Sequence, residues 1–225
     1  MVGIRAMLLV GVAALAGCAN LAGRVGAPAA ETAAAPAPRF TYVPPLQSPG
    51  EGVALAVEGS PEAVRQRLIA RAAQPPFQPG PTDPSGTFVI ATFSGDPERF
   101  VNCGYLIGYV QGAASPPQAY PAARANLTVP RGEGATAERQ LQLDARITVR
   151  LTPEAGITLI STEALYVISK PVDTLGGTPR PAETVSFASD RRGTLADGTV
   201  CQPNGMLERE ILRDLLPGPT GPAAV

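Results

Sequence analysis

Three cysteines are the residues of this sequence with the widest covalent chemistry. Cys18 ends the segment "LAGC", Cys103 lies in "RFVNCGY", and Cys201 lies in "GTVCQPNG". A thiol can be acylated or oxidised to a disulfide, and as a thiolate it can act in redox chemistry. The chain contains no histidine, so it lacks the commonest metal ligand and general base. The thiols are therefore the first candidates for a functional role.

The residues before Cys18 have the pattern of an export signal. Residues 1–5 carry one positive charge and no negative one, and residues 6–14 are apolar apart from one glycine. The run is shorter than the roughly 20 apolar residues that a transmembrane helix needs. The segment Leu15-Ala16-Gly17-Cys18 resembles the lipobox of bacterial lipoproteins. The alternatives are an ordinary signal peptide with an incidental cysteine and an N-terminal anchor helix.

The lipobox resemblance implies a cellular location. It implies that residues 1–17 are removed, that the Cys18 thiol carries diacylglycerol, and that the new amine carries a third acyl chain. Each buried CH₂ group contributes about 0.8 kcal/mol, so several chains give a stable anchor. Ala19 follows the cysteine, which by resemblance to the enteric sorting rule favours the periplasmic face of the outer membrane over the inner membrane.

With Cys18 lipidated, Cys103 and Cys201 remain as a pair in an oxidising compartment, where disulfides persist. A bridge between them would close a loop of roughly 100 residues, which the chain-entropy model credits with about 4–5 kcal/mol. Two buried thiols and a redox pair are the alternatives. Redox cysteines usually lie close together in sequence, so we expect a structural disulfide.

The remaining polar residues form no recognisable catalytic set. The sequence contains no nucleophile elbow, phosphate loop or metal-binding pair. Charged residues make up 16% of the chain, the net charge is −1, and no basic run occurs, so nucleic acid is not expected as a partner. We therefore predict a protein that is not an enzyme and that uses no metal and no cofactor.

Composition divides the mature chain into three parts. Residues 18–50 are rich in Ala and Pro and are expected to form a disordered tether behind the lipidated cysteine. Residues 51–216 are expected to form a single domain, and residues 217–225 a disordered tail.

Hydrophobic periodicity predicts the elements of that domain. Alternation is clearest at 141–151, where apolar residues at odd positions indicate a strand with one buried face. Residues 157–169 are expected to return antiparallel, with a bulge near 161–163 because their alternation is less regular. Strands are also predicted at 53–57, 87–94 and 183–190, and a strand or a strand with a loop at 104–112.

Two helices are predicted. The first covers 59–73, with Ser60 as N-cap and Pro61 at the first helical position. The second covers 204–216, with Asn204 as a cap. This order predicts an α+β fold of two layers, a curved antiparallel sheet with one or both helices packed on one face. The arrangement resembles helix-grip folds, including domains of outer-membrane assembly lipoproteins, in element order only.

The connection at 111–138 is long for a compact domain. Connections beyond about 12–15 residues are usually functional or disordered, and the Pro and Ala content here favours disorder. If a surface segment contacts a partner, we expect this one, with Tyr120 and Arg124 as contacts.

Two functions are compatible with these features. The first is a structural or accessory subunit of a cell-envelope assembly, anchored by its lipid and bound to an envelope protein. The second is a lipoprotein that binds a lipid or another small apolar ligand on the concave face of the sheet. A deep apolar cavity would favour the second function, and a packed sheet face with exposed apolar residues would favour the first.

Overall fold

A long two-stranded hairpin runs through the domain. The computed structural model describes residues 39–216 except 51, 82, 110–115 and 133–134, so the predicted signal segment 1–17, Cys18 and the tail 217–225 lie outside the described residues. The hairpin consists of β9 (Ala135–Glu154) and β10 (Ile157–Asp173), joined by a turn in which Gly156 has a φ of +81°. The predicted inward residues of β9 are all buried: Leu141, Leu143, Ala145, Ile147, Val149 and Leu151.

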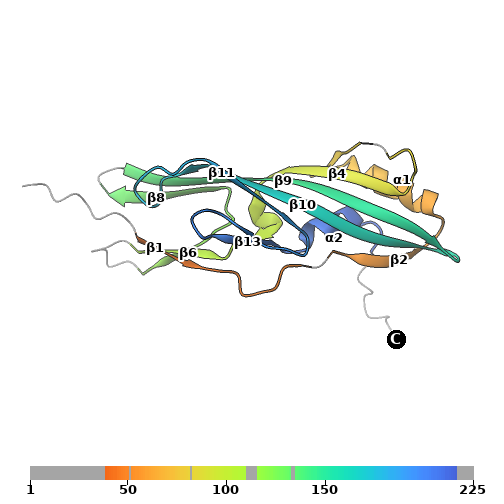
Figure 1. Ribbon diagram of the computed structural model, residues 1–225, viewed down its shortest axis with the longest axis horizontal. Coiled ribbons are helices and arrows are strands. Elements are labelled where there is room, and N and C mark those ends of the chain that lie inside the picture. The colour runs from red at the N-terminus through yellow and green to blue at the C-terminus, as the bar shows by residue number, and fades with distance from the viewer. Residues whose placement is uncertain (1–38, 51, 82, 110–115, 133–134, 217–225) are drawn as a thin grey trace, which may run out of the picture. The chain divides into compact units, whose positions relative to one another are not determined.

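The other strands of the main sheet add to the two edges of this hairpin. The strand order is β11 (Glu183–Ala188), β10, β9, β4 (Phe88–Gly95) and β3 (Gln78–Pro79), with every neighbour antiparallel. β10 also pairs with β2 (Ala54–Glu58), and β9 with β8 (Asn126–Gly132). β9 and β10 are long enough for each to carry two partners along its outer edge (Figure 1).

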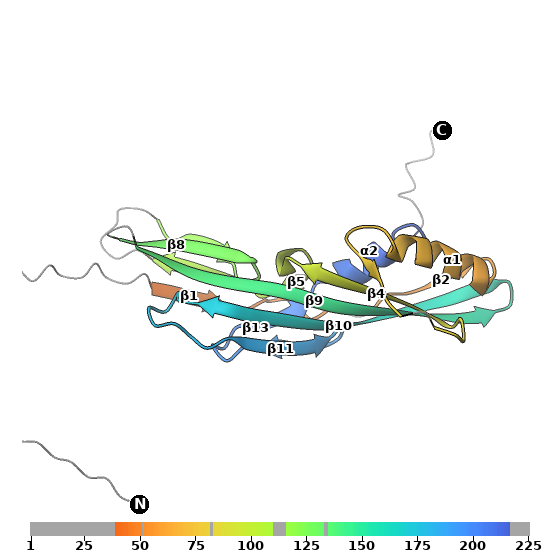
Figure 2. The same ribbon diagram turned by 90° about the horizontal axis from the view of Figure 1, so that it is seen from above.

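Two helices lie on one side of this sheet (Figure 2). α1 (Pro61–Ala72) begins as predicted, because the side chain of Ser60 accepts a hydrogen bond from the Ala63 N–H and Pro61 follows it. α2 (Met206–Leu212) has Gly205 as its N-cap residue, while the Asn204 side chain accepts from the Met206 N–H at 3.0 Å. α1 packs against β4, β9, β10 and α2, and α2 also contacts β10.

Two smaller sheets complete the described part of the chain. One has the order β1 (Arg39–Val43), β6 (Tyr105–Tyr109) and β7 (Gln118–Pro121). The other has the order β12 (Gly193–Thr194), β13 (Val200–Pro203) and β5 (Val101–Asn102), and a short 3-10 helix η1 (Pro97–Arg99) precedes β5. The α+β class with a curved antiparallel sheet is therefore confirmed, although the single predicted sheet is accompanied by two others.

Two segments expected to be disordered form strands instead. β1 lies inside the predicted tether 18–50. This strand forms because Phe40 and Tyr42 pack against the core and its backbone pairs with β6. Likewise β7, β8 and the start of β9 lie inside the connection 111–138. Leu127 and Val129 of β8 are buried, and β8 pairs with β9. Prolines obscured the strands in both segments, and for β1 the pairing partner, β6, also lies far away in sequence.

The predicted bulge in β10 occurs at a different place. Ser161–Glu163 pair regularly with β9. The polar Thr162 fits the buried face without a bulge because its hydroxyl accepts a hydrogen bond from the Val53 N–H at 2.8 Å and donates one to the Val53 carbonyl at 3.1 Å. The irregularity lies between Ser169 and Val172. Pro171 within it has no N–H to donate to the ladder.

Candidate functional site

The predicted disulfide is confirmed. Cys103 and Cys201 are bonded across a sequence separation of 98, and both are fully buried. Cys201 lies in β13, which pairs with β5 immediately before Cys103. The bond therefore joins the β12–β13 hairpin to the part of the chain that leads into β6.

The two predicted contact residues lie near each other in sequence but differ in environment. Tyr120 is a half-buried residue of β7 that packs against the core, and its hydroxyl donates to Oε1 of Gln118. Arg124 follows β7, is 44% exposed and forms an ion pair with Glu98 at 3.5 Å. Their contact with a partner stays a prediction.

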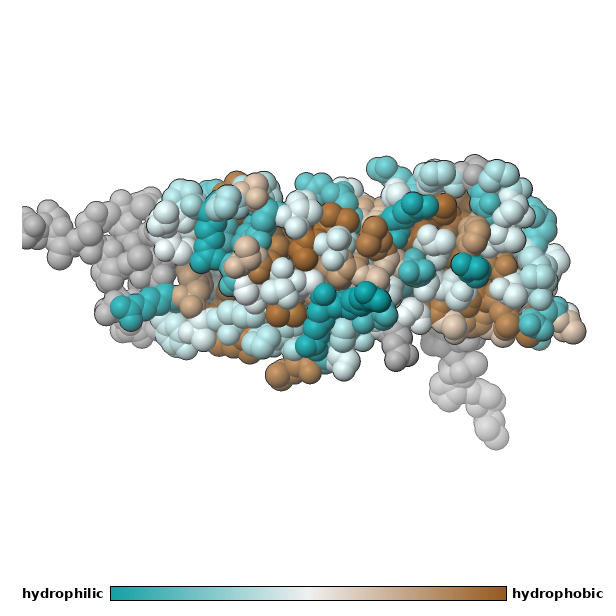
Figure 3. Space-filling model, in the orientation of Figure 1, coloured by the Kyte–Doolittle hydropathy of each residue, from teal (hydrophilic) through white to brown (hydrophobic). Residues whose placement is uncertain are grey.

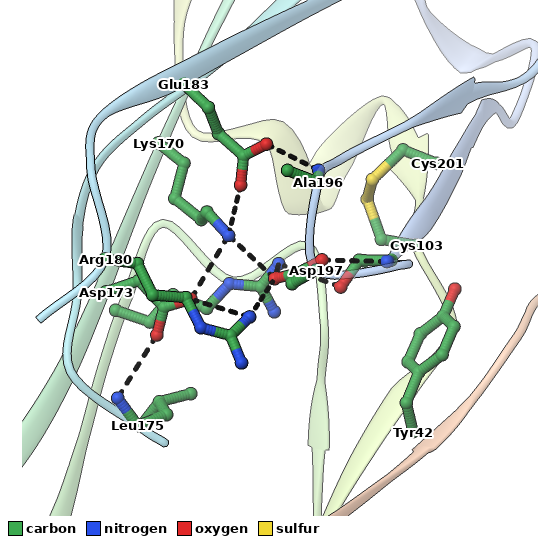
Figure 4. A network of polar contacts seen from close by, with 12 residues as sticks. Tyr42, Cys103, Lys170, Asp173, Leu175, Arg180, Glu183, Ala196, Asp197 and Cys201 are labelled. Carbon is green, nitrogen blue, oxygen red and sulfur yellow. Dashed lines mark hydrogen bonds and ion pairs between the residues drawn. A yellow bond between two sulfur atoms is a disulfide. The ribbon is translucent and has the colours of Figure 1, made fainter. Parts of the chain in front are cut away.

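A group of charged side chains, most of them buried, lies at the β10 bulge (Figure 4). This group, the Lys170 cluster, consists of Lys170, Asp173, Glu183, Asp197, Arg139 and Arg180. Before the bulge the inward residues of β10 are even-numbered, and after it the inward residue is Asp173. The extra residue thus brings Lys170 and Asp173 to one face, with 3.1 Å between Nζ and Oδ2.

Two further carboxylates reach Lys170 from other elements. Glu183, the first residue of β11, is 2.5 Å from Nζ, and it also accepts a hydrogen bond from the Ala196 N–H. Asp197 lies at the tip of the β12–β13 hairpin, 2.7 Å from Nζ, and its other oxygen accepts from the Thr199 N–H. The cluster therefore fastens the hairpin tip to β10 and β11.

Electrostatics keep the central groups charged. Burial lowers the pKa of Lys170, but hydrogen bonds to Asp197, Glu183 and Asp173 outweigh burial and leave the pKa raised. Burial raises the pKa of Asp197, but hydrogen bonds from Lys170 and Thr199 outweigh burial and lower the pKa to about 2. Both groups are therefore ionised across the physiological pH range.

A cavity of about 440 Å³ lies beside the cluster. Arg139 of β9, Arg180 of the β10–β11 connection and Arg39 of β1 all line it, so we call it the Arg139 cavity. Asp173 and Asp197 also line it, and Phe40, Leu106 and Leu175 supply apolar walls. Tyr42 is a further lining residue, and its hydroxyl is fixed by the carbonyl and N–H of Val200, at 3.0 and 2.8 Å.

A second buried polar group lies under α2. Glu208 is fully buried, and its Oε1 accepts hydrogen bonds from Tyr166 at 2.7 Å and Ser189 at 2.8 Å. Burial and the neighbouring Glu208 carboxylate raise the pKa of Tyr166, so the phenol stays protonated and donates. This group ties α2 to the centre of β10.

The Lys170 cluster was missed at the sequence level, although a signal for it exists. Lys170 continues the inward series of Tyr166 and Ile168, and Arg139 stands two residues before the inward Leu141. A charged residue at an inward strand position is expected to be paired or functional. Its partners could not be found, because Asp197 and Glu183 come from other elements.

No family model, curated protein or solved structure matches the chain, so the site is interpreted from its own geometry. Within the described ranges, no group of three or more His, Cys, Asp or Glu side chains is arranged to hold a metal ion. No helix among the same residues is long and apolar enough to cross a membrane.

Proposed function

We propose that this protein is a lipid-anchored protein of the periplasm that serves as a structural or accessory subunit of a cell-envelope assembly. The observation that carries the proposal is the segment Leu15-Ala16-Gly17-Cys18 behind a short apolar run. Acylation at Cys18, with the outer membrane as destination, is part of the proposal.

The disulfide supports an extracytoplasmic location. Bonds of this kind form and persist in oxidising compartments and are rare where thioredoxin and glutathione keep thiols reduced. Cys103 and Cys201 are both fully buried and join separate elements, as in a structural bond.

A non-catalytic role is supported by the charge states of the Lys170 cluster. A general acid or base works best when its pKa lies near the operating pH. Here the pKa of Lys170 is raised and that of Asp197 is lowered to about 2, away from neutrality in both cases. The ion pairs suit a structural role better than proton transfer.

Exposed apolar residues support a role in assembly. On β10, Leu159 is 38% and Leu165 is 49% exposed, at positions that alternate with the buried face. Figure 3 shows hydrophobic residues gathered over the middle of the visible face. A contiguous apolar patch on a protein surface is typical of a site that binds another protein.

Crosslinking in intact cells, followed by purification in mild detergent and mass spectrometry, tests the assembly role. We expect one or two envelope proteins in a fixed ratio to the lipoprotein. Recovery of the protein alone would contradict the assembly role. Cys18→Ser should abolish both acylation and the co-purification of membrane partners, whereas the neighbouring change Ala19→Ser should preserve acylation.

Ligand binding is the second candidate, and the Arg139 cavity is the observation that favours it. The cavity combines apolar walls with guanidinium groups. That lining differs from the apolar pocket expected for a lipid tail, and it points to a ligand with a charged group.

A further inference from the structure

Arg139 is a buried cation whose hydrogen-bonding capacity is poorly used. The residue is 2% exposed, and its guanidinium reaches Thr199 Oγ1 at 3.4 Å and Asp197 Oδ2 at 3.9 Å. Among the described residues, its buried Nε has no hydrogen-bond partner. Guanidinium groups carry five N–H donors, and leaving buried donors unsatisfied is costly.

The carboxylates near Arg139 are already engaged elsewhere. Asp197 Oδ2 lies 2.7 Å from Lys170 Nζ, much closer than to Arg139. Arg180 is in the same situation, because its closest approaches to Asp197 and Asp173 are 3.7 and 3.9 Å. Both guanidinium groups therefore approach the Asp197 carboxylate, which already forms a shorter ion pair with Lys170.

The guanidinium groups with unused hydrogen-bond donors line the same cavity, the Arg139 cavity. Arg139 lines it from β9, Arg180 from the β10–β11 connection, and Arg39 from β1. Counting Lys170 with these arginines gives four cations against three carboxylates, from Asp173, Glu183 and Asp197. The site thus carries one excess positive charge, which a single monoanion would neutralise.

We propose that the Arg139 cavity binds a small monoanionic oxyanion, a carboxylate or a phosphodiester, through the guanidinium groups of Arg139, Arg180 and Arg39. Planar guanidiniums match carboxylate and phosphate oxygens in bidentate geometry. Phe40, Leu106 and Leu175 would contact the apolar part of the ligand. The site does not depend on acylation of Cys18, so its failure and the failure of the proposed anchor are distinguishable.

Calorimetric titration of the full chain in a nonionic detergent tests the site, with dimethyl phosphate and propionate as separate probes. We expect saturable binding of at least one probe. Arg180→Gln removes a side chain that is 46% exposed, so the fold should tolerate the change. We expect Arg180→Gln and Arg39→Gln each to weaken binding about ten-fold, the size of one charge-assisted hydrogen bond.

Arg191→Gln is the matched control, because Arg191 is 77% exposed and does not line the cavity. The Arg191→Gln chain should bind the probe with the same affinity as the unaltered chain. Arg139→Lys retains the buried charge but loses the planar guanidinium, so this change should also weaken binding of the phosphodiester probe. Absence of saturable binding for both probes, or equal binding by the Arg180→Gln and Arg191→Gln chains, would overturn the proposal.

The source of the oxyanion is distinguished by a competition. Phosphatidylglycerol added to the detergent micelles should displace the phosphodiester probe if a lipid headgroup can enter the cavity, and phosphatidylcholine should not. If neither lipid competes while the probe still binds, the cavity takes a free anion.

Discussion

Lys170 lies on the buried face of β10, where a charge is costly unless other charges compensate it. Three carboxylates contact its Nζ within 3.1 Å, and these bonds explain why both Lys170 and Asp197 remain ionised. Breaking such a buried pair from one side is typically far more damaging than the pair itself is stabilising. We therefore expect the free energy of unfolding to depend steeply on the charge of Asp197.

Acid titration measures that dependence. The pKa of Asp197 is lowered from 3.8 to about 2 in the folded chain, so its contribution is fully present above pH 4 and is lost as the pH falls through about 2. The difference corresponds to about 2 kcal/mol in the free energy of unfolding. Asp197→Asn should lower stability at pH 7 and flatten the loss between about pH 4 and pH 2, measured by urea denaturation at each pH.

Asp190→Asn is the control for this titration, because Asp190 is an exposed residue with a side chain 66% accessible. The free energy of unfolding of the Asp190→Asn chain should follow that of the unaltered chain over the same pH range. If Asp197→Asn followed that curve too, the carboxylate would not hold the cluster together.

Tyr166 provides a second test at the same scale. Its hydroxyl donates to the fully buried carboxylate of Glu208 at 2.7 Å, and the other carboxylate oxygen, Oε2, has no partner among the described residues. Tyr166→Phe should therefore lower the free energy of unfolding by about 1.5–3 kcal/mol, the usual contribution of a hydrogen bond to a charged group. Tyr105→Phe, at a side chain 52% exposed, should change it by less than about 0.5 kcal/mol.

At the scale of elements, the disulfide and the Lys170 cluster hold the β12–β13 hairpin at its two ends. Cys201 fastens β13 to the segment before β6, and Asp197 fastens the hairpin tip to β10 and β11. Tyr42 of β1 adds hydrogen bonds to Val200 between them. The hairpin is short, so these side-chain bonds position it more than its own ladder does.

Removal of the disulfide should loosen that hairpin. Cys103→Ser combined with Cys201→Ser opens a loop with a sequence separation of 98, and the chain-entropy model then gives a loss of about 4–5 kcal/mol in the free energy of unfolding. Urea denaturation measures the loss, and amide exchange of residues 195–200 should accelerate more than that of the α1 helix. Equal stability of the oxidised chain and the double variant would show that the bond contributes nothing.

Elements with strong local patterns could be predicted, and elements that depend on distant partners could not. The alternation of β9 and the cap of α1 are local signals, and both were predicted correctly. β1 and β13 are short and pair with β6 and β5, which lie far away in sequence, whereas β7 pairs with the nearby β6 but is short and ends in proline. The Lys170 cluster joins side chains from β9, β10, β11 and the β12–β13 hairpin, so only its inward Lys170 and Arg139 were visible as signals.

At the scale of the whole molecule, the proposed anchor and the Arg139 cavity are separated by a chain segment of limited length. Residues 19–38 lie between Cys18 and the start of β1, and a fully extended chain of that length reaches about 70 Å. Arg39, the first residue of β1, lines the cavity. If Cys18 is acylated, this tether limits how far the cavity can lie from the membrane surface.

Mass spectrometry of the N-terminal peptide, from protein purified out of the membrane fraction of the cells that produce it, tests the central claim most directly. We expect the mature chain to begin at Cys18, with a diacylglycerol on the thiol and an acyl chain on the amine. A peptide that retains residues before Cys18, or one that begins at Cys18 with an unmodified thiol, would contradict the lipid anchor and the function proposed from it.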